Sequence, residues 1–110
     1  KLENFKKVSV KMQKLDDIKK NNEIGFIKID VEGHEENVIL GSSQTIKRNK
    51  PVMLIEIEER HTQKPIINTI NLIKEYGYNA YILRENNYDL IDITKVNSFS
   101  DERNFFFIKK

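Results

Sequence analysis

The stretch FIKIDVEGHEE, residues 26–36, decides how this chain folds. A short apolar run at 26–29 ends in two acidic residues and a glycine, and a polar segment typical of a helix start follows. Nearly continuous apolar runs are typical of strands buried in a parallel sheet. Because ligands of open α/β sheets bind outside the carboxyl ends of such strands, the side chains after this run are predicted to line a ligand site. These side chains are Asp30, Glu32 and His34.

Length and composition indicate a small soluble protein. At 110 residues the chain is predicted to form a single α/β domain, residues 1–110, with a modest hydrophobic core. Hydrophobic residues make up 38% of the chain and charged residues 33%, which is typical of a globular protein. The sequence has no cysteine, which excludes disulfides, thiolate metal ligands and a cysteine nucleophile.

The charge and hydropathy patterns argue against two classes of partner. The formal net charge is +2, and the basic residues form short pairs that are not interleaved with aromatic residues, so no nucleic-acid partner is predicted. No apolar run approaches the ~20 residues of a membrane-spanning helix, so no membrane partner is predicted. The N-terminal residues lack the apolar segment of a signal peptide. A cytoplasmic protein is the resulting expectation.

Strand and helix patterns alternate along the first half of the chain. Residues 8–12 alternate apolar and polar side chains, which predicts a half-buried strand or an extended arm. A helix is predicted from residue 33 to about residue 48, with a break at Gly41, because the residue before Pro51 is forced out of the helical region. The apolar run at 52–57 predicts the strongest strand of the chain.

The second half of the chain continues this alternation. Three isoleucines at helical spacing, 66, 70 and 73, predict a helix that Thr62 or Gln63 caps and Gly77 ends. Strands are predicted at 78–83, 88–93 and 104–108. This order predicts an α/β fold, a mostly parallel sheet flanked by helices with an antiparallel C-terminal strand.

Several segments match one known family in content and in order. KIDVEGHE at 28–35 is followed by VILG at 38–41 and preceded by Leu-Asp-Asp at 15–17. A proline-started strand ending in glutamate at 51–56, Tyr-Gly-Tyr at 76–78 and a closing Phe-Phe-Ile strand come later. On these residues the chain resembles the FkbM family of S-adenosylmethionine-dependent methyltransferases.

The resemblance implies a Rossmann-like, class I methyltransferase fold, of which this chain matches the C-terminal half. Rossmann-like folds hold their cofactor with a glycine-rich turn after the first strand. This chain has four glycines, at 25, 33, 41 and 77, and none of them form a Gly-x-Gly turn. The N-terminal, glycine-rich cofactor half is therefore expected to be absent from residues 1–110.

The resemblance also implies catalytic roles for three residues. Asp30 and Glu32 lie two residues apart and project to the same side of an extended segment. Together with His34 they are expected to face the cofactor or to remove the proton of the acceptor hydroxyl during methyl transfer. The structural alternative is that the two carboxylates cap the next helix by accepting its free N–H groups.

Further residues are expected to bind the cofactor or the acceptor. Cofactor contacts are expected from Asp30, and from Asp16 and Asp17, for which a helix cap is the alternative. Glu56 ends the neighbouring strand and is expected to face Asp30 and the substrate; an ion-paired surface carboxylate is its alternative. His61 is expected to face the substrate or solvent. No metal site is predicted, because the sequence has no histidine-rich constellation.

The resulting hypothesis is an O-methyltransferase that transfers a methyl group from S-adenosyl-L-methionine to a hydroxyl of a small molecule such as a sugar or polyketide. The alternative is a non-catalytic, truncated or partner-completed α/β module. In that case the strand at 26–29 is an exposed edge, and a homodimer or the missing N-terminal half is the expected partner.

Overall fold

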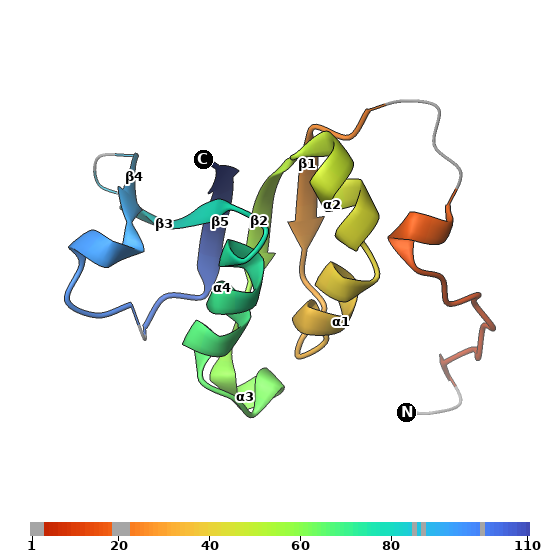
Figure 1. Cartoon of the computed structure of the whole chain (residues 1–110). Coiled ribbons are helices and arrows are strands. Elements are labelled where there is room, and N and C mark those ends of the chain that lie inside the picture. The colour runs from red at the N-terminus through yellow and green to blue at the C-terminus, as the bar shows by residue number, and fades with distance from the viewer. Residues whose placement is uncertain (1–3, 19–22, 85, 87, 100) are drawn as a thin grey trace.

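The computed structural model describes residues 4–18, 23–84, 86, 88–99 and 101–110. These residues form a five-stranded sheet in the order β1-β2-β5-β3-β4, with helices packed against it (Figure 1). The strands are β1 (Phe26–Ile29), β2 (Val52–Glu56), β3 (Tyr78–Arg84), β4 (Asp89–Asp92) and β5 (Asn104–Lys109). The helices are α1 (Glu35–Leu40), α2 (Ser43–Asn49), α3 (Glu59–Thr62) and α4 (Ile66–Lys74), with 3₁₀ turns η2 (Leu15–Asp17) and η3 (Ile93–Lys95).

The sheet is mixed, which corrects the prediction of a mostly parallel one. Only β1 and β2 pair in parallel. β5 pairs antiparallel with both β2 and β3, as the predicted antiparallel C-terminal strand, and β4 forms a hairpin with β3. The last strand of the chain thus inserts between β2 and β3, which run in the same direction, and separates two strands that would otherwise be parallel neighbours.

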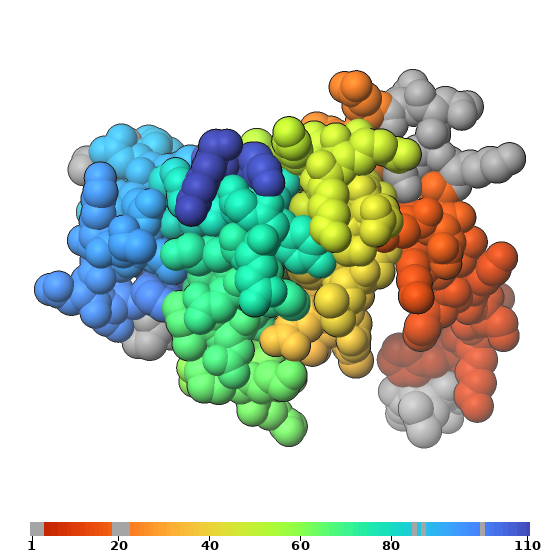
Figure 2. Space-filling model, in the orientation of Figure 1, coloured from red at the N-terminus to blue at the C-terminus, as the bar shows by residue number. Residues whose placement is uncertain are grey.

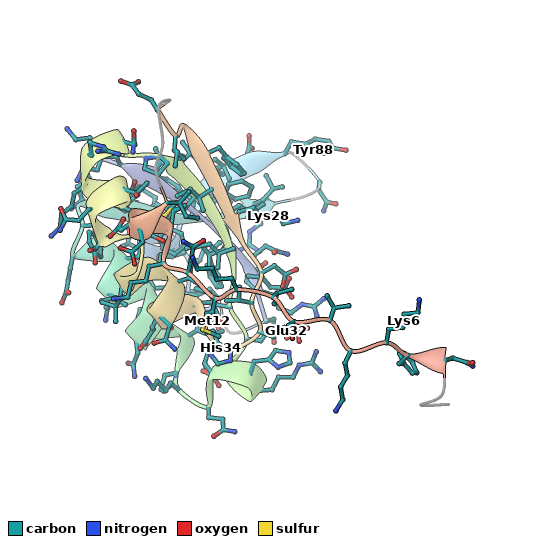
Figure 3. The ribbon with its side chains drawn as sticks, turned by 90° about the vertical axis from the view of Figure 1, so that its right-hand side faces the viewer. Lys6, Met12, Lys28, Glu32, His34 and Tyr88 are labelled. Carbon is teal, nitrogen blue, oxygen red and sulfur yellow. The ribbon has the colours of Figure 1, made fainter. Side chains whose placement is uncertain are left out.

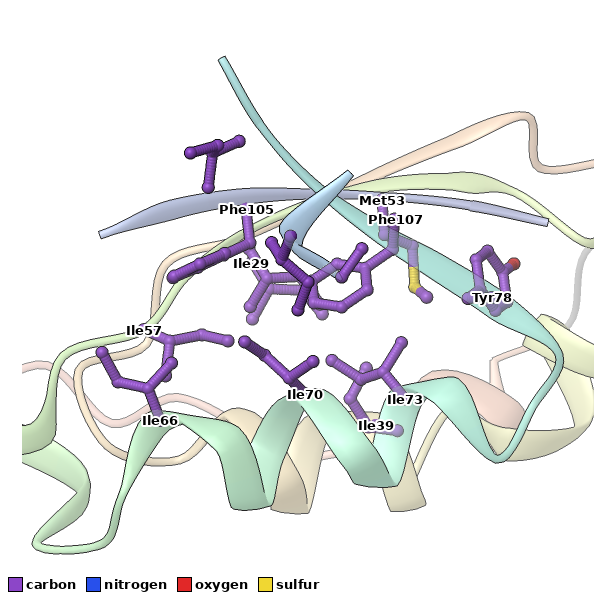
Figure 4. Packing of buried hydrophobic residues seen from close by; sticks show 14 of the residues in the cluster. Ile29, Ile39, Met53, Ile57, Ile66, Ile70, Ile73, Tyr78, Phe105 and Phe107 are labelled. Carbon is purple, nitrogen blue, oxygen red and sulfur yellow. The ribbon is translucent and has the colours of Figure 1, made fainter. Parts of the chain in front are cut away.

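The hydrophobic core lies between one face of the sheet and the helices α1, α2 and α4 (Figure 4). Alternate residues of β2 are buried, Met53 and Ile55, and they pair in register with Phe107 and Phe105 of β5. The helices contribute further isoleucines, all with 5% or less of their surface exposed: Ile39, Ile46, Ile66, Ile70 and Ile73. The isoleucines whose helical spacing was noted in the sequence therefore form the side of the core that the helices contribute.

The other face of the sheet is partly exposed. A cross-strand row on this face runs from Lys28 through Leu54 and Phe106 to Tyr81. The last three of these side chains are half-buried, and Phe26 at the edge is 53% exposed. Because no described helix packs over this row, the prediction of helices flanking the sheet holds for one face.

The structure decides three local predictions. Residues 8–12 form an exposed N-terminal arm and no strand, which is the second of the two predicted alternatives. The break at Gly41 is confirmed: α1 ends at Leu40 and α2 begins at Ser43, and Ser42 Oγ donates to the Val38 carbonyl at 2.6 Å; the first helix begins at Glu35 and not at residue 33. Pro65, rather than Thr62 or Gln63, occupies the N-cap position of α4.

Asp16 fixes the N-terminus of α2 to η2. Its carboxylate accepts hydrogen bonds from the Gln44 N–H at 3.0 Å, the Thr45 N–H at 2.9 Å and the Thr45 hydroxyl at 2.8 Å. These are free donors of the first helical turn, and the negative charge also complements the positive end of the helix. The helix-cap alternative for Asp16 is therefore the role that the contacts show.

Replacing Asp16 by alanine should lower the free energy of unfolding by about 1–2 kcal/mol, because the first turn of α2 loses its capping acceptor. Urea unfolding followed by circular dichroism measures this change. Asp17→Ala is the matched control, since the Asp17 side chain is exposed and a change within about 0.5 kcal/mol is expected. Equal losses in the two variants would contradict the capping role.

Candidate functional site

The ends of β1 and β2 bring two carboxylates together. The two strands are parallel, with Ile29 aligned to Ile55. Continuing this register by one residue sets Asp30 beside Glu56, at the carboxyl edge of the sheet. Glu56 and Asp30 line one hollow, and their carboxylates are electrostatically coupled, as described below. The strand ends therefore form the centre of the candidate site.

A tight turn carries the chain from β1 into α1. Glu32 and Gly33 both have positive φ, 46° and 104°, which places them in the left-handed region of backbone space. The Gly33 N–H donates to Glu35 Oε2 at 2.6 Å, so the first residue of α1 closes the turn. Glu35 is 1% exposed, and its second oxygen, Oε1, is buried without a hydrogen-bond partner among the described residues. The acidic motif therefore stabilises its own turn.

This turn lies directly against α3, the short helix that follows β2. A Cβ atom at Gly33 would lie 2.5 Å from the carbonyl oxygen of His61, closer than real Cβ contacts come. The position therefore requires glycine for two reasons, the positive φ and the contact with the backbone of residue 61. The contact joins the two segments that carry the acidic side chains.

The pKa of Glu56 is raised above its usual range. Desolvation contributes most, followed by the negative charge of Asp30 and a side-chain hydrogen bond to Asp30. Glu58 adds further repulsion, and Arg103 opposes it. Two neighbouring carboxylates disfavour simultaneous ionisation, so the pair Asp30–Glu56 is suited to holding a proton and to releasing it.

Glu58, two residues further on, is in the opposite electrostatic state. Arg103 Nη1 lies 3.0 Å from its Oε1, and Arg60 Nε lies 3.1 Å from its Oε2. The hydrogen bond from Arg103 is the main cause that lowers the pKa of Glu58, with Arg60 adding to it. His61 Nε2 approaches Glu58 Oε2 at 2.9 Å, although the two atoms do not meet hydrogen-bond geometry. These contacts favour the ionised form of Glu58.

A narrow hollow lies between these residues. It is lined by Asp30, Glu32, Glu35, Glu56, Glu58 and His61. Its closed part leaves no room for a water molecule. A hydroxyl is about as large as water and a methyl group is larger, so a ligand group would reach these carboxylates from the open side without entering the hollow.

The structure brings together only some of the predicted site residues. Asp30, Glu32, Glu56 and His61 line the hollow, and the His61 side chain is 28% exposed, so the fully exposed alternative for His61 does not apply. His34 occupies the N-cap position of α1 with an exposed side chain, on the same turn as Glu32 (Figure 3).

Asp16 and Asp17 lie on η2, next to the start of α2, and do not line the hollow. The hydrogen bonds of Asp16 to Gln44 and Thr45 already occupy both of its oxygens. Cofactor contacts from these two aspartates stay a prediction.

The sequence analysis missed Glu58 and Arg103 as functional candidates. Arg103 immediately precedes β5, which inserts beside β2, and the Ile57 N–H donates to the Arg103 carbonyl at 2.7 Å. Forty-five residues separate Arg103 from Glu58. No local spacing signals such a contact; the acidic run Glu58-Glu59 after a strand was the one available hint.

The described residues contain no group of three or more histidine, aspartate or glutamate side chains arranged to hold a metal ion. No helix in the described part of the chain is long and apolar enough to cross a membrane.

Comparison with protein families matches residues 2–80 to the methyltransferase FkbM domain. The chain belongs to this family. The matched residues include the N-terminal arm, β1, both acidic strand ends and α4, whereas most of β3 and all of β4 and β5 follow the match. No curated protein and no solved structure shows a significant match.

Gly33→Ala tests the contact between Gly33 and the backbone of His61, which joins the segments that follow β1 and β2. The added methyl would meet the His61 carbonyl and force a strained φ, so we expect a loss of about 1–3 kcal/mol in the free energy of unfolding. Gly25→Ala is the matched control, because no atom lies within 4 Å of the added Cβ. A loss at Gly25 as large as that at Gly33 would contradict the proposed constraint.

Glu56→Gln tests the carboxylate pair through pH dependence. A folded-state pKa above the unfolded one favours the protonated form, so this stabilisation is present at low pH and is lost as pH rises through the folded pKa. We expect the variant to melt at a higher temperature than the parent at about pH 8, and at nearly the same temperature at about pH 4. Calorimetric melting curves measure this, with exposed Glu75→Gln as control. A pH-independent difference would argue against the pair.

Proposed function

We propose that this FkbM-family chain belongs to an O-methyltransferase that uses S-adenosyl-L-methionine and methylates a hydroxyl of a small molecule such as a sugar or polyketide. Family membership supports methyl transfer. The observation that carries the finer proposal is the Asp30–Glu56 pair, in which the pKa of Glu56 is raised. A carboxylate with a raised pKa is the stronger base, as the removal of a hydroxyl proton requires.

In this reaction the residues of the chain would bind the acceptor and remove its proton. Glu56 in its ionised form accepts the proton of the acceptor hydroxyl, while Asp30 and Glu32 accept hydrogen bonds from neighbouring hydroxyls and orient the acceptor. The deprotonated acceptor oxygen would then be free to form a bond to a methyl carbon, and the thioether sulfur would be the leaving group. S-adenosylmethionine, when bound, supplies that methyl group. His61 and His34 stand beside this path, His61 held near the ionised Glu58.

The donor set of the hollow fits one end of the cofactor. Several carboxylates line the hollow, and their negative charge favours a positively charged sulfonium at its open side. The adenosyl end has no comparable partner here: both oxygens of Asp16 cap α2, and the four glycines lie far apart in sequence. The described residues would therefore contact the sulfonium and methyl group of the cofactor rather than its adenosyl group.

A second candidate function is the non-catalytic, partner-completed module. The observation in its favour is that β1, which carries Asp30 at its end, is the last strand of the sheet on its side. In such a module the same carboxylates would act only after a partner supplies the rest of the sheet.

Titration calorimetry of the 110-residue chain distinguishes the two functions. If the carboxylates face a sulfonium, S-adenosylmethionine should bind at least about tenfold more tightly than S-adenosylhomocysteine, which lacks the positive charge. Asp30→Asn should remove most of this difference without lowering the melting temperature, because it also relieves the repulsion of Glu56. Asp89→Asn, at an exposed position on β4, is the control and should keep the difference.

Equal affinities for the two compounds would contradict the carboxylate–sulfonium contact. Absence of binding by a folded sample would favour the partner-completed module. Methyl transfer from labelled S-adenosylmethionine to a panel of sugar and polyketide acceptors then tests the acceptor class.

A further inference from the structure

The outer edge of β1 is open. β1 is hydrogen-bonded to β2 on one side, and no described strand pairs with its other side. Such an edge presents unpaired N–H and C=O groups and is a template for another strand. Phe26, at its start, is 53% exposed, and Ile27 is only half-buried, so the edge also exposes apolar surface.

The N-terminal arm, defined here as residues 4–14, has the complementary properties. Val8, Val10 and Met12 alternate with polar residues in the pattern of a strand, yet they are 77%, 85% and 96% exposed. Residues 5–14 are extended and belong to no strand. The start of the arm stands clear of the rest of the molecule, and Lys6 lies far from the sheet (Figures 2 and 3).

The charges of the two segments are also complementary. The arm contains four lysines and no acidic residue, whereas Asp30 and Glu32 follow directly after β1. A basic strand lying along this edge would bring positive charge to an acidic strand end. Opposite charges placed across neighbouring strands stabilise their pairing.

We propose that the arm of a second copy of this chain pairs with the β1 edge, and that the exchange is reciprocal, giving a two-fold symmetric dimer. A register that sets Ser9 opposite Lys28 explains the alternation of apolar and polar residues in the arm, whether the two strands pair in parallel or antiparallel. In both directions Val8 and Val10 fall opposite Ile27 and Ile29, on the core face of the sheet. The period of two makes this register specific, since a slip of one residue would turn both valines to the other face.

The same register adds a residue to the candidate site. In an antiparallel pairing Lys7 falls opposite Asp30, and in a parallel pairing Lys11 does. Either way the partner copy contributes a lysine to the acidic strand end. The proposal does not depend on the methyltransferase reaction, and it assigns a role to apolar residues that the described fold leaves in solvent.

Two variants of the arm, expected to change dimerisation in opposite directions, test the dimer. Light scattering and sedimentation measure the mass of the assembly. The parent chain should have twice the 13.0 kDa mass of one copy. Val10→Asp places a carboxylate against the apolar edge and should weaken association by at least about tenfold. Ser9→Asp places the same charge opposite Lys28 and should strengthen association. Circular dichroism confirms that both variants fold, which is expected because the arm lies outside the core.

Disulfide trapping then identifies the contact, because the chain has no cysteine of its own. Chains carrying Ile27→Cys are mixed with chains carrying Val8→Cys, Val10→Cys or Ser9→Cys, and the mixed disulfide is measured after mild oxidation. Val10→Cys should react best if the pairing is antiparallel, and Val8→Cys if it is parallel. Ser9→Cys, whose side chain projects to the other face, is the matched control and should react several-fold less.

Each remaining outcome would overturn the proposal. A chain that stays monomeric at high concentration has no such dimer. Equal trapping of all three arm positions would indicate random collisions. A dimer that neither Val10→Asp weakens nor Val8→Cys or Val10→Cys traps would use a different surface.

Discussion

The contact between Gly33 and the backbone of His61 is the constraint on which the candidate site depends. Each of the two neighbouring strands ends in acidic residues, and the segments that follow would normally diverge into separate helices. Because residue 33 has no side chain, the turn after β1 lies against α3, the short helix after β2, instead. Glu35 holds this turn closed from the first residue of α1, through the Gly33 N–H. Carboxylates from two segments thereby line one hollow.

The fold then gives these carboxylates different electrostatic states. Glu58 is held by Arg60 from its own loop and by Arg103 from the start of β5, and its pKa falls. Glu56 lies two residues earlier, beside Asp30, and its pKa rises because of desolvation and of the neighbouring negative charge. Environments that separate the pKa values of neighbouring acids are typical of sites that transfer protons. The insertion of β5 beside β2 is what delivers Arg103, so a feature of the topology decides the electrostatics of the site.

Local patterns predicted most of the elements and only half of the site. The apolar runs and the helix-spaced isoleucines correctly located β1, β2 and α4, because burial imposes those periods. The adjacency of Asp30 and Glu56 also followed from local information, since both end parallel strands. The place of β5 in the sheet and the ion pair of Arg103 with Glu58 depend on contacts across the chain, which no spacing records. The alternating pattern of residues 8–12 left a strand and an extended arm open for the same reason: such a pattern suits a strand but does not supply its neighbour.

The position of β1 links the chemistry of the site to its assembly. In a doubly wound sheet a ligand binds where neighbouring strands end and their connections diverge, so both neighbours of a strand contribute to its site. β1 has one neighbour among the described strands, and that neighbour supplies Glu56 and Glu58. Asp30 and Glu32 therefore lie between two different sides: on one, β2 supplies further carboxylates, of which Glu58 is paired with two arginines; on the other, no described strand lies beside β1. Whatever pairs with the β1 edge will set both the shape of the second wall and the charge against which these carboxylates act.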